Sequence, residues 1–133
     1  MDLTLSPGIL NEVTSHAKSS YPAEGCGLLV GRQAADRFIP MRNTSRSAAE
    51  YEMEPGELIR TLRELRATGE ELIAIYHSHP HGPPEPSQTD VRRAYYPAAA
   101  HLIISLAEPE RPRAAAFRII DGAVFPVELH VIV

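Results

Sequence analysis

Residues 71–90 have the sequence ELIAIYHSHPHGPPEPSQTD, in which the type of residue pattern, and with it the expected secondary structure, changes twice. Glu71 to Tyr76 is a short apolar run of the kind that forms a buried strand. Pro80 to Pro86 contains four prolines and a glycine, which predicts a stiff loop without regular structure. Ser87 is a favoured N-cap residue and predicts a short helix that ends before Pro97. The stretch therefore predicts a strand, a loop and a helix in succession.

Two histidines and a carboxylate on this stretch form a set of candidate zinc ligands. Alternate residues of a strand project to the same side, so His77 and His79 can bind one metal ion while Ser78 faces away. Asp90 lies in the first turn of the following helix, where it can complete the site. Zinc favours imidazole nitrogen and carboxylate oxygen, and three protein ligands leave a fourth position open for water. The spacing therefore predicts one catalytic Zn²⁺ per chain.

A catalytic zinc site also needs a general base that is not itself a ligand. The best candidate is Glu24, because it immediately precedes Gly25 to Gly31, an apolar run of strand type. Ser87 is a candidate for a second role besides capping the helix. Its hydroxyl can donate a hydrogen bond to the oxyanion of a tetrahedral intermediate. Glu24 and Ser87 are therefore the candidate catalytic residues.

The remainder of the chain alternates between strand-like and helix-like segments. Leu3 and Leu5 indicate a short first strand, and Ser6-Pro7 reads as the start of a helix that ends near Ser20. Glu54-Pro55 opens a second helix, which ends at Gly69. Its expected buried face consists of Leu58, Ile59, Leu62 and Leu65. Further strands are predicted at 25–30, 37–42, 51–53, 101–106, 114–120 and 123–133, the last two joined by an Asp121-Gly122 turn. Together these segments predict a single α/β sheet domain over residues 1–133, with about three helices.

Composition and charge exclude several classes of protein. Of the 133 residues, 44% are hydrophobic and 23% are charged, as in ordinary soluble domains. The net charge of −4 offers no basic surface for nucleic acid. Neither a membrane-spanning apolar run nor a signal peptide is visible, so we expect a cytoplasmic protein without a membrane partner. The single cysteine, Cys26, excludes an intramolecular disulfide and a Cys-rich zinc site.

The candidate site residues also carry a family resemblance. His77-Ser78-His79-Pro80, then Ser87-Gln88-Thr89-Asp90 after six residues, with Glu24 upstream, resembles the signature of the JAMM/MPN+ metalloprotease family. The resemblance implies that His77, His79 and Asp90 bind zinc. It also implies that Glu24 is the general acid/base and that Ser87 stabilises the oxyanion.

The same resemblance implies a fold and an activity. The fold would be a curved mixed β-sheet flanked by helices, similar in architecture to cytidine deaminases. The activity would be cleavage of amide or isopeptide bonds after the C-terminal glycine of ubiquitin or a ubiquitin-like protein. The chain is too compact for the long insertions with which eukaryotic deubiquitinases grip ubiquitin. It is more similar to the small prokaryotic branch, which removes cysteine or a fused residue from the Gly-Gly end of ubiquitin-like sulfur-carrier proteins.

We therefore expect a sulfur-carrier protein with a Gly-Gly tail as substrate, bound with its tail along an exposed strand edge. The enzyme would be a monomer or a weak homodimer, with no nucleic-acid partner. Two alternatives are a catalytically silent MPN scaffold that binds a protein partner and a RadC-like JAMM protein linked to DNA. The complete set of candidate zinc ligands argues against the silent scaffold, and the net negative charge gives no support to a link with DNA.

Other side chains near these motifs are weaker candidates. Four of them are candidate substrate contacts, two beside the ligands and two in the polar loop 43–49: Ser78, His81, Asn43 and Ser45. Tyr95 and Tyr96 fit either a substrate groove or core packing at a helix end, and core packing is favoured. Cys26 reads as a buried structural cysteine, and His101 as an ordinary sheet residue.

Overall fold

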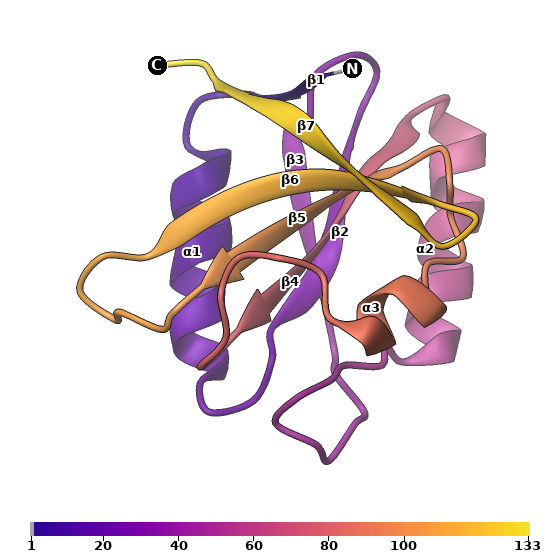
Figure 1. Ribbon diagram of the computed structural model, residues 1–133. Helices are drawn as coiled ribbons and strands as arrows, with labels where there is room; N and C mark the ends of the chain where they lie inside the picture. Colours follow the sequence, from indigo (N-terminus) through magenta and orange to yellow (C-terminus); the bar gives the residue numbers. More distant parts are fainter. Residues whose placement is uncertain (1) are drawn as a thin grey trace.

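The computed structural model describes residues 2–133, which form seven β-strands and three α-helices (Figure 1). In chain order these are β1 (Asp2–Leu5), α1 (Ile9–Ser20), β2 (Cys26–Gly31), β3 (Arg37–Met41), α2 (Pro55–Thr68), β4 (Glu71–His79), α3 (Gln88–Arg92), β5 (Ala100–Ser105), β6 (Arg113–Ile120) and β7 (Ala123–Val131). The predicted α/β class, with three helices among the described residues, is confirmed.

All seven strands belong to one mixed sheet in the order β1-β7-β6-β5-β4-β2-β3. The β1–β7 and β4–β5 pairs are parallel, and the other pairs are antiparallel. The sheet twists strongly, so that β6 and β7 cross in front of the central strands, with α1 to one side and α2 to the other (Figure 1). The curved mixed sheet implied by the family resemblance is therefore present.

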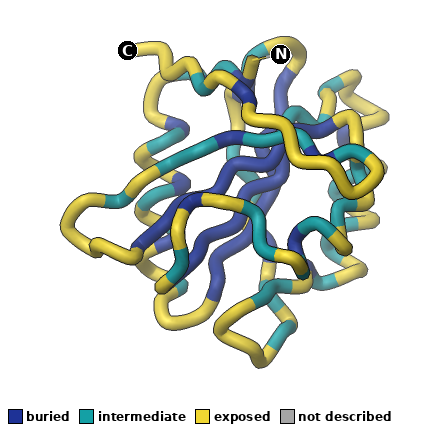
Figure 2. The backbone as a smooth tube through the Cα atoms, in the orientation of Figure 1, coloured by how far each residue is buried: buried dark blue, intermediate teal, exposed yellow. Residues whose placement is uncertain are grey.

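Two apolar clusters lie on opposite faces of the sheet, and β4 contributes to both. Ala74 and Tyr76 belong to the cluster that contains the buried side of α1. Ile75 belongs to the cluster that contains Leu65 of α2. Figure 2 shows the central strands as the most deeply buried part of the chain. Because side chains alternate along a strand, His77 and His79 fall on the same face as Ile75.

Helix α2 begins and ends where the sequence predicts. The Glu54 carboxylate accepts hydrogen bonds from the backbone N–H groups of Gly56 and Glu57. At the other end, Gly69 has a φ of 78°, and its N–H bonds to the Leu65 carbonyl at 2.9 Å. The expected buried face was wrong at Ile59, which is 54% exposed. Positions 58, 62 and 65 follow helical spacing along one stripe, and Ile59 lies at its border.

The first helix starts later than predicted. Helix α1 begins at Ile9, after Gly8 with a φ of 85°, and has no side-chain cap. Ser6 lies outside the helix, and its backbone N–H donates to the Ala35 carbonyl at 2.9 Å.

Two other segments differ from their predicted extents. Residues 51–53 form no strand; Met53 makes an isolated bridge with Asn43. Strand β4 runs on through both histidines, because β5 pairs beside it as far as His79↔Ser105. Among the described residues, no helix combines the length and apolar character needed to cross a bilayer.

Candidate active site

Strand β4 and helix α3 bring three candidate ligand atoms together. The Nε2 atoms of His77 and His79 lie 3.1 Å apart, and Asp90 Oδ2 lies 3.0 and 3.1 Å from them. Ligands about 2.0–2.1 Å from a tetrahedral zinc ion are about 3.3 Å from one another. All three side chains are buried. Two imidazoles and one carboxylate at these separations fit a zinc ion.

Local hydrogen bonds aim these atoms at one point. Ser87 Oγ accepts the Asp90 N–H at 3.1 Å, and Asp90 Oδ2 accepts the Ser87 N–H at 2.9 Å, which makes a capping box at the start of α3. His79 Nδ1 lies 2.8 Å from the Pro83 carbonyl. As a carbonyl only accepts, Nδ1 carries the proton and leaves Nε2 free for a metal. The proline loop therefore sets the tautomer of His79.

Glu24 lies beside this cluster, just before β2. Glu24, His77 and His79 each offer one ligand atom, a carboxylate oxygen and two ring nitrogens, and these three atoms lie within 4.8 Å of one another. Glu24 is 3% exposed, and its Oε1 has no hydrogen-bond partner among the described residues. Burial raises the pKa of Glu24 to about 7. A buried carboxylate oxygen without a partner indicates a group missing from its surroundings, such as water on a metal ion.

The pKa shifts of the ligands follow from burial and from their contacts with one another. Burial lowers the pKa of His77. Burial also opposes ionisation of Asp90, but hydrogen bonds from His77 and His79 outweigh it and hold the pKa of Asp90 below its usual value. For His79, contacts with Asp90 and Pro83 outweigh desolvation and raise the pKa. Asp90 is therefore the anionic member of the set.

Two of the four candidate substrate contacts, Ser78 and Asn43, make hydrogen bonds within the protein. Ser78 is fully buried on the other face of β4, where its Oγ accepts the Gly25 N–H at 2.7 Å. Asn43 donates from Nδ2 to the Glu24 carbonyl at 2.9 Å, and its Oδ1 accepts the backbone N–H groups of Ser45 and Glu52. Both side chains hold the peptide group between Glu24 and Gly25, and their role as substrate contacts stays a prediction.

The other two candidates have different surroundings. Ser45 Oγ accepts the Ser47 N–H at 3.1 Å and so shapes the polar loop. His81 is exposed and lies edge-on to Tyr21, with ring centroids 5.5 Å apart. His81 also lines a cavity next to the ligands, so it stays a candidate contact.

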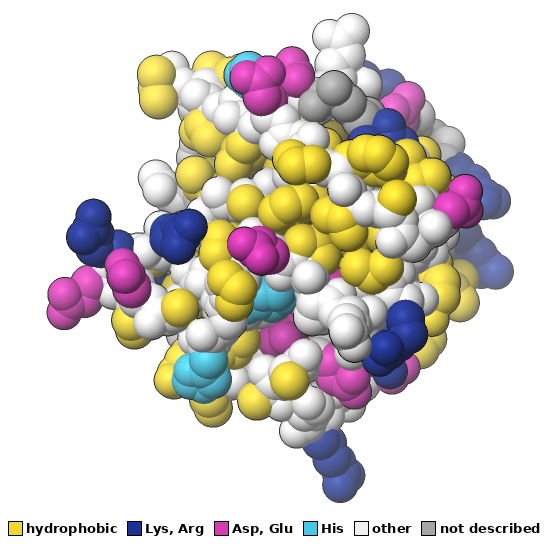
Figure 3. All heavy atoms as spheres, in the orientation of Figure 1, with side chains coloured by type: hydrophobic (Ala, Val, Ile, Leu, Met, Phe, Trp, Pro, Cys, Tyr) yellow, Lys and Arg dark blue, Asp and Glu magenta, His cyan; other side chains and the backbone are white. Residues whose placement is uncertain are grey.

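Two cavities flank the ligand cluster. The first, here called the Pro80–Ser87 cleft, has a volume of about 360 Å³. Its lining includes Glu24, Ala48, His79, Pro83, Glu85 and Ser87. Figure 3 shows histidine and acidic side chains gathered below the hydrophobic surface over β6 and β7.

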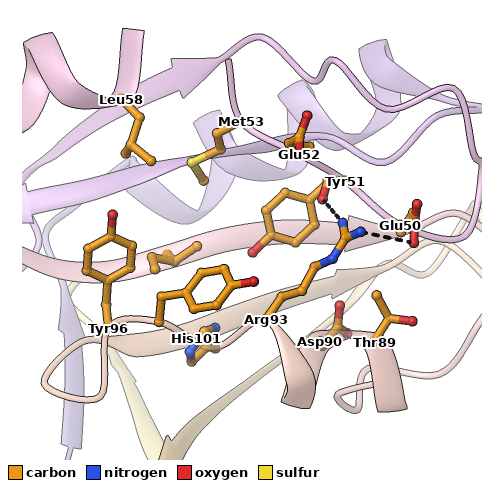
Figure 4. A pocket seen from close by; sticks show the side chains of 12 residues that line it. Glu50, Tyr51, Glu52, Met53, Leu58, Thr89, Asp90, Arg93, Tyr96 and His101 are labelled. Atoms are coloured by element: carbon orange, nitrogen blue, oxygen red, sulfur yellow. Dashed lines mark hydrogen bonds and ion pairs between the residues drawn. The ribbon is translucent and has the colours of Figure 1, made fainter. Parts of the chain in front are cut away.

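The second cavity, here called the Tyr51 pocket, has a volume of about 260 Å³ (Figure 4). Its lining includes Tyr51, Met53, Asp90, Arg93, Tyr96 and His101. Asp90 is the candidate ligand that reaches this pocket, whereas Glu24 does not line it. The ligand cluster therefore lies between two cavities of different character, and the second has tyrosine rings in its lining.

Sequence reasoning missed two residues of this second cavity. The Tyr51 ring stacks on the His77 ring with centroids 4.7 Å apart and 25° between the planes. His101 is 3% exposed, its Nε2 has no partner among the described residues, and burial lowers its pKa to about 4. Tyr51 follows a polar loop, so nothing local indicated this packing. For His101, an available signal was its place in an otherwise apolar strand.

Comparisons with known proteins agree with this geometry. Residues 6–120 match the model of Prok-JAB, the prokaryotic homologs of the JAB domain. The CysO-cysteine peptidase of Mycobacterium tuberculosis is 35% identical over 133 residues, which cover 98% of this chain and 91% of that protein. A desampylase of Haloferax volcanii is 35% identical over 111 residues, covering 77% of this chain and 80% of the relative.

Solved structures show the same fold. A protein from Desulfitobacterium hafniense superposes with a TM-score of 0.87 at 34% identity, covering 98% of this chain and 92% of the other. A JAB1/MPN domain protein from Archaeoglobus fulgidus superposes with a TM-score of 0.67 at 22% identity, covering 99% of this chain and 98% of the other. The resemblance to JAMM/MPN proteins seen in the sequence is thus confirmed, and the chain belongs to the Prok-JAB family, the prokaryotic homologs of the JAB domain.

Proposed function

We propose that this chain is a zinc-dependent metallopeptidase that hydrolyses the amide bond after the C-terminal Gly-Gly of a ubiquitin-like sulfur-carrier protein. The observation that carries the proposal is the convergence of His77, His79 and Asp90 within 3.1 Å beside Glu24, whose Oε1 has no hydrogen-bond partner within residues 2–133. The names of the two relatives, a CysO-cysteine peptidase and a desampylase, support a peptidase.

His77, His79 and Asp90 would hold the zinc ion. Zinc bound there would polarise the scissile carbonyl and lower the pKa of a water molecule. Asp90 supplies the single negative charge of the donor set, and the two imidazoles are neutral. The ligands thus leave the site with a net positive charge, which favours attack by hydroxide at neutral pH.

Glu24 would move the proton. Its carboxylate takes a proton from the attacking water and delivers it to the leaving nitrogen as the carbon–nitrogen bond breaks. A base with a pKa near 7 can do both at neutral pH. The Ser87 hydroxyl oxygen accepts a hydrogen bond from the backbone N–H of Asp90, so the hydroxyl proton is free to stabilise the oxyanion.

The tail of the carrier would approach from the side of the Tyr51 pocket. Two extended glycines span roughly 7 Å. The residues that precede Gly-Gly would therefore reach the aromatic surface beyond Asp90, while the scissile bond lies at the ligands. This placement leaves the Pro80–Ser87 cleft, which Glu24 lines, for the leaving group.

The test combines zinc quantitation with a cleavage assay. Protein purified without chelator should contain one zinc per chain and should cut carrier–Gly-Gly–peptide fusions, as followed by mass spectrometry. Chelation should abolish cleavage, and added zinc should restore it. Glu24→Gln should keep its zinc, and its kcat should fall by a factor of about 10²–10⁴. Ubiquitin fusions serve as the comparison substrate.

Two results would contradict the proposal. One is cleavage by zinc-loaded Glu24→Gln at the wild-type rate, which would remove Glu24 from the mechanism. The other is a zinc-loaded wild-type protein that cuts none of the carrier fusions, which would remove the activity itself.

A further inference from the structure

We propose that the Pro80–Ser87 cleft selects a leaving group whose amine ends a long aliphatic side chain, such as the lysine of an acceptor protein, over a free amino acid that carries an α-carboxylate. This inference rests on the proposed function and specifies which class of amide the same site cuts best. It follows from the position of Glu24, from the walls of the cleft and from the charges that line it.

The position of Glu24 assigns the leaving group to this cleft. The leaving nitrogen must receive a proton from the general acid, and Glu24 Oε1 is buried without a partner among the described residues. Glu24 lines the Pro80–Ser87 cleft and does not line the Tyr51 pocket. The atoms bonded to the leaving nitrogen therefore enter the cleft.

The walls of the cleft suit an aliphatic chain. Pro80, Pro83 and Pro86 line it together with Ala48 and Ala49. Proline has no backbone N–H, so three of these residues cannot donate to an anion. The four methylene groups of a lysine side chain match such a surface, because they need no hydrogen-bond partner.

The charges in the cleft disfavour an anion. Glu24 and the exposed Glu85 line it, whereas none of its lining residues within 2–133 is Lys or Arg. His81 is the one histidine of the lining outside the ligand set, and its ring packs edge-on against Tyr21. The α-carboxylate of a free amino acid lies two bonds from the leaving nitrogen, so it would enter the cleft and face the Glu85 carboxylate, while Glu24 is neutral when it carries the proton. In an isopeptide, the lysine α-carbon lies five bonds away and its carboxyl group is already in a peptide bond.

Three matched substrates test the inference. Each consists of the carrier that the wild-type protein cleaves, joined after Gly-Gly to cysteine with a free carboxylate, to cysteine amide, or to the lysine Nε of a short peptide. The first two differ only by the charge. We expect kcat/KM for the amide to exceed that for the acid by about 3- to 30-fold, as for one like-charge contact of moderate screening. The isopeptide should be cut at least as well as the amide.

Variants at Glu85 assign the effect to the cleft. Glu85→Gln should reduce the amide-to-acid ratio, and Glu85→Lys should bring it to one or below. Glu64→Gln, on the exposed side of α2, is the matched control and should keep the wild-type ratio. Equal kcat/KM for acid and amide in the wild type would overturn the inference, as would a ratio unchanged by Glu85→Lys. Either result would leave the peptidase activity in place, so it is distinct from failure of the proposed function, in which no substrate is cut.

Discussion

Asn43 and Ser78 hold Glu24 in place although neither side chain reaches the cleft. Asn43 bonds the carbonyl of Glu24, and Ser78 bonds the N–H of Gly25, so the peptide group between Glu24 and Gly25 is held on both sides. A general base works only when its carboxylate is held within reach of the proton that it takes. The polar residues around a buried carboxylate therefore matter for its position as much as for its pKa.

The buried His101 makes it possible to test how burial of one imidazole changes the pH dependence of stability. Its folded-state pKa of about 4 lies below the ordinary value of 6.5, so the unfolded chain binds a proton more readily. Stability should therefore be lost as the pH falls from 6.5 toward 4. In metal-free protein, the wild type should lose about 2–3 kcal/mol more than His101→Gln between pH 7 and 4.5.

The measurement for His101 is urea unfolding of both proteins across this pH range. Because His77 and the carboxylates are common to both, the difference between the two curves isolates His101. Parallel curves would show that the imidazole finds a partner or solvent in the folded protein.

Helix α3 is short, yet its first turn connects the fold with the chemistry. Its capping box uses Ser87 Oγ and Asp90 Oδ2, and the same Asp90 oxygen lies beside both histidines. The bonds that start the helix thus also orient a candidate zinc ligand. A change in this turn is expected to alter both stability and rate, and the two effects need separate variants.

Ser87→Gly and Ser87→Ala separate capping from catalysis. Alanine at an N-cap typically costs about 1 kcal/mol of stability, and glycine only a few tenths. Both variants lack the hydroxyl, so both should lose about 10²–10³ in kcat while their stabilities differ. Urea unfolding and the carrier cleavage assay give the two quantities. A Ser87→Gly protein with wild-type kcat would exclude the hydroxyl from oxyanion stabilisation.

Over the whole molecule, the candidate site joins parts of the chain that are far apart in sequence. Glu24 precedes β2, the histidines lie on β4, and Asp90 lies on α3. In the sheet, β2 and β4 are neighbours, with Cys26 opposite His77. A metal ion bound to β4 and α3 should therefore stabilise the folded state as a whole.

Zinc should raise the melting temperature of the chelator-treated protein in a concentration-dependent way. A ligand at 1,000 times its Kd stabilises the folded state by about 4 kcal/mol, which corresponds to a shift on the order of 10 °C for a domain of this size. Asp90→Asn is the matched control, since its side-chain oxygen can still accept the Ser87 N–H but brings no charge. Thermal unfolding with and without zinc checks this, and equal shifts in both proteins would contradict binding at this site.

Much of the fold was predictable because its signals are local. The caps of α2 at Glu54 and Gly69, the strand character of residues 71–76 and the turn at Asp121-Gly122 depend on neighbouring residues only. The start of α1 was mispredicted for the opposite reason. There the backbone N–H of Ser6 bonds to Ala35, which is remote in sequence, and the helix begins only after Gly8.

The spacing of His77, His79 and Asp90 could be read from the sequence because one short stretch contains all three, and strand and helix periodicity place them on one side. The position of Glu24 beside them, the stacking of Tyr51 on His77 and the burial of His101 depended on the tertiary structure. So did the division of the site into two cavities. These contacts join residues that are remote in sequence, and strand order and register bring them together. Local periodicity specifies which side a residue faces, but not which strand lies next to it.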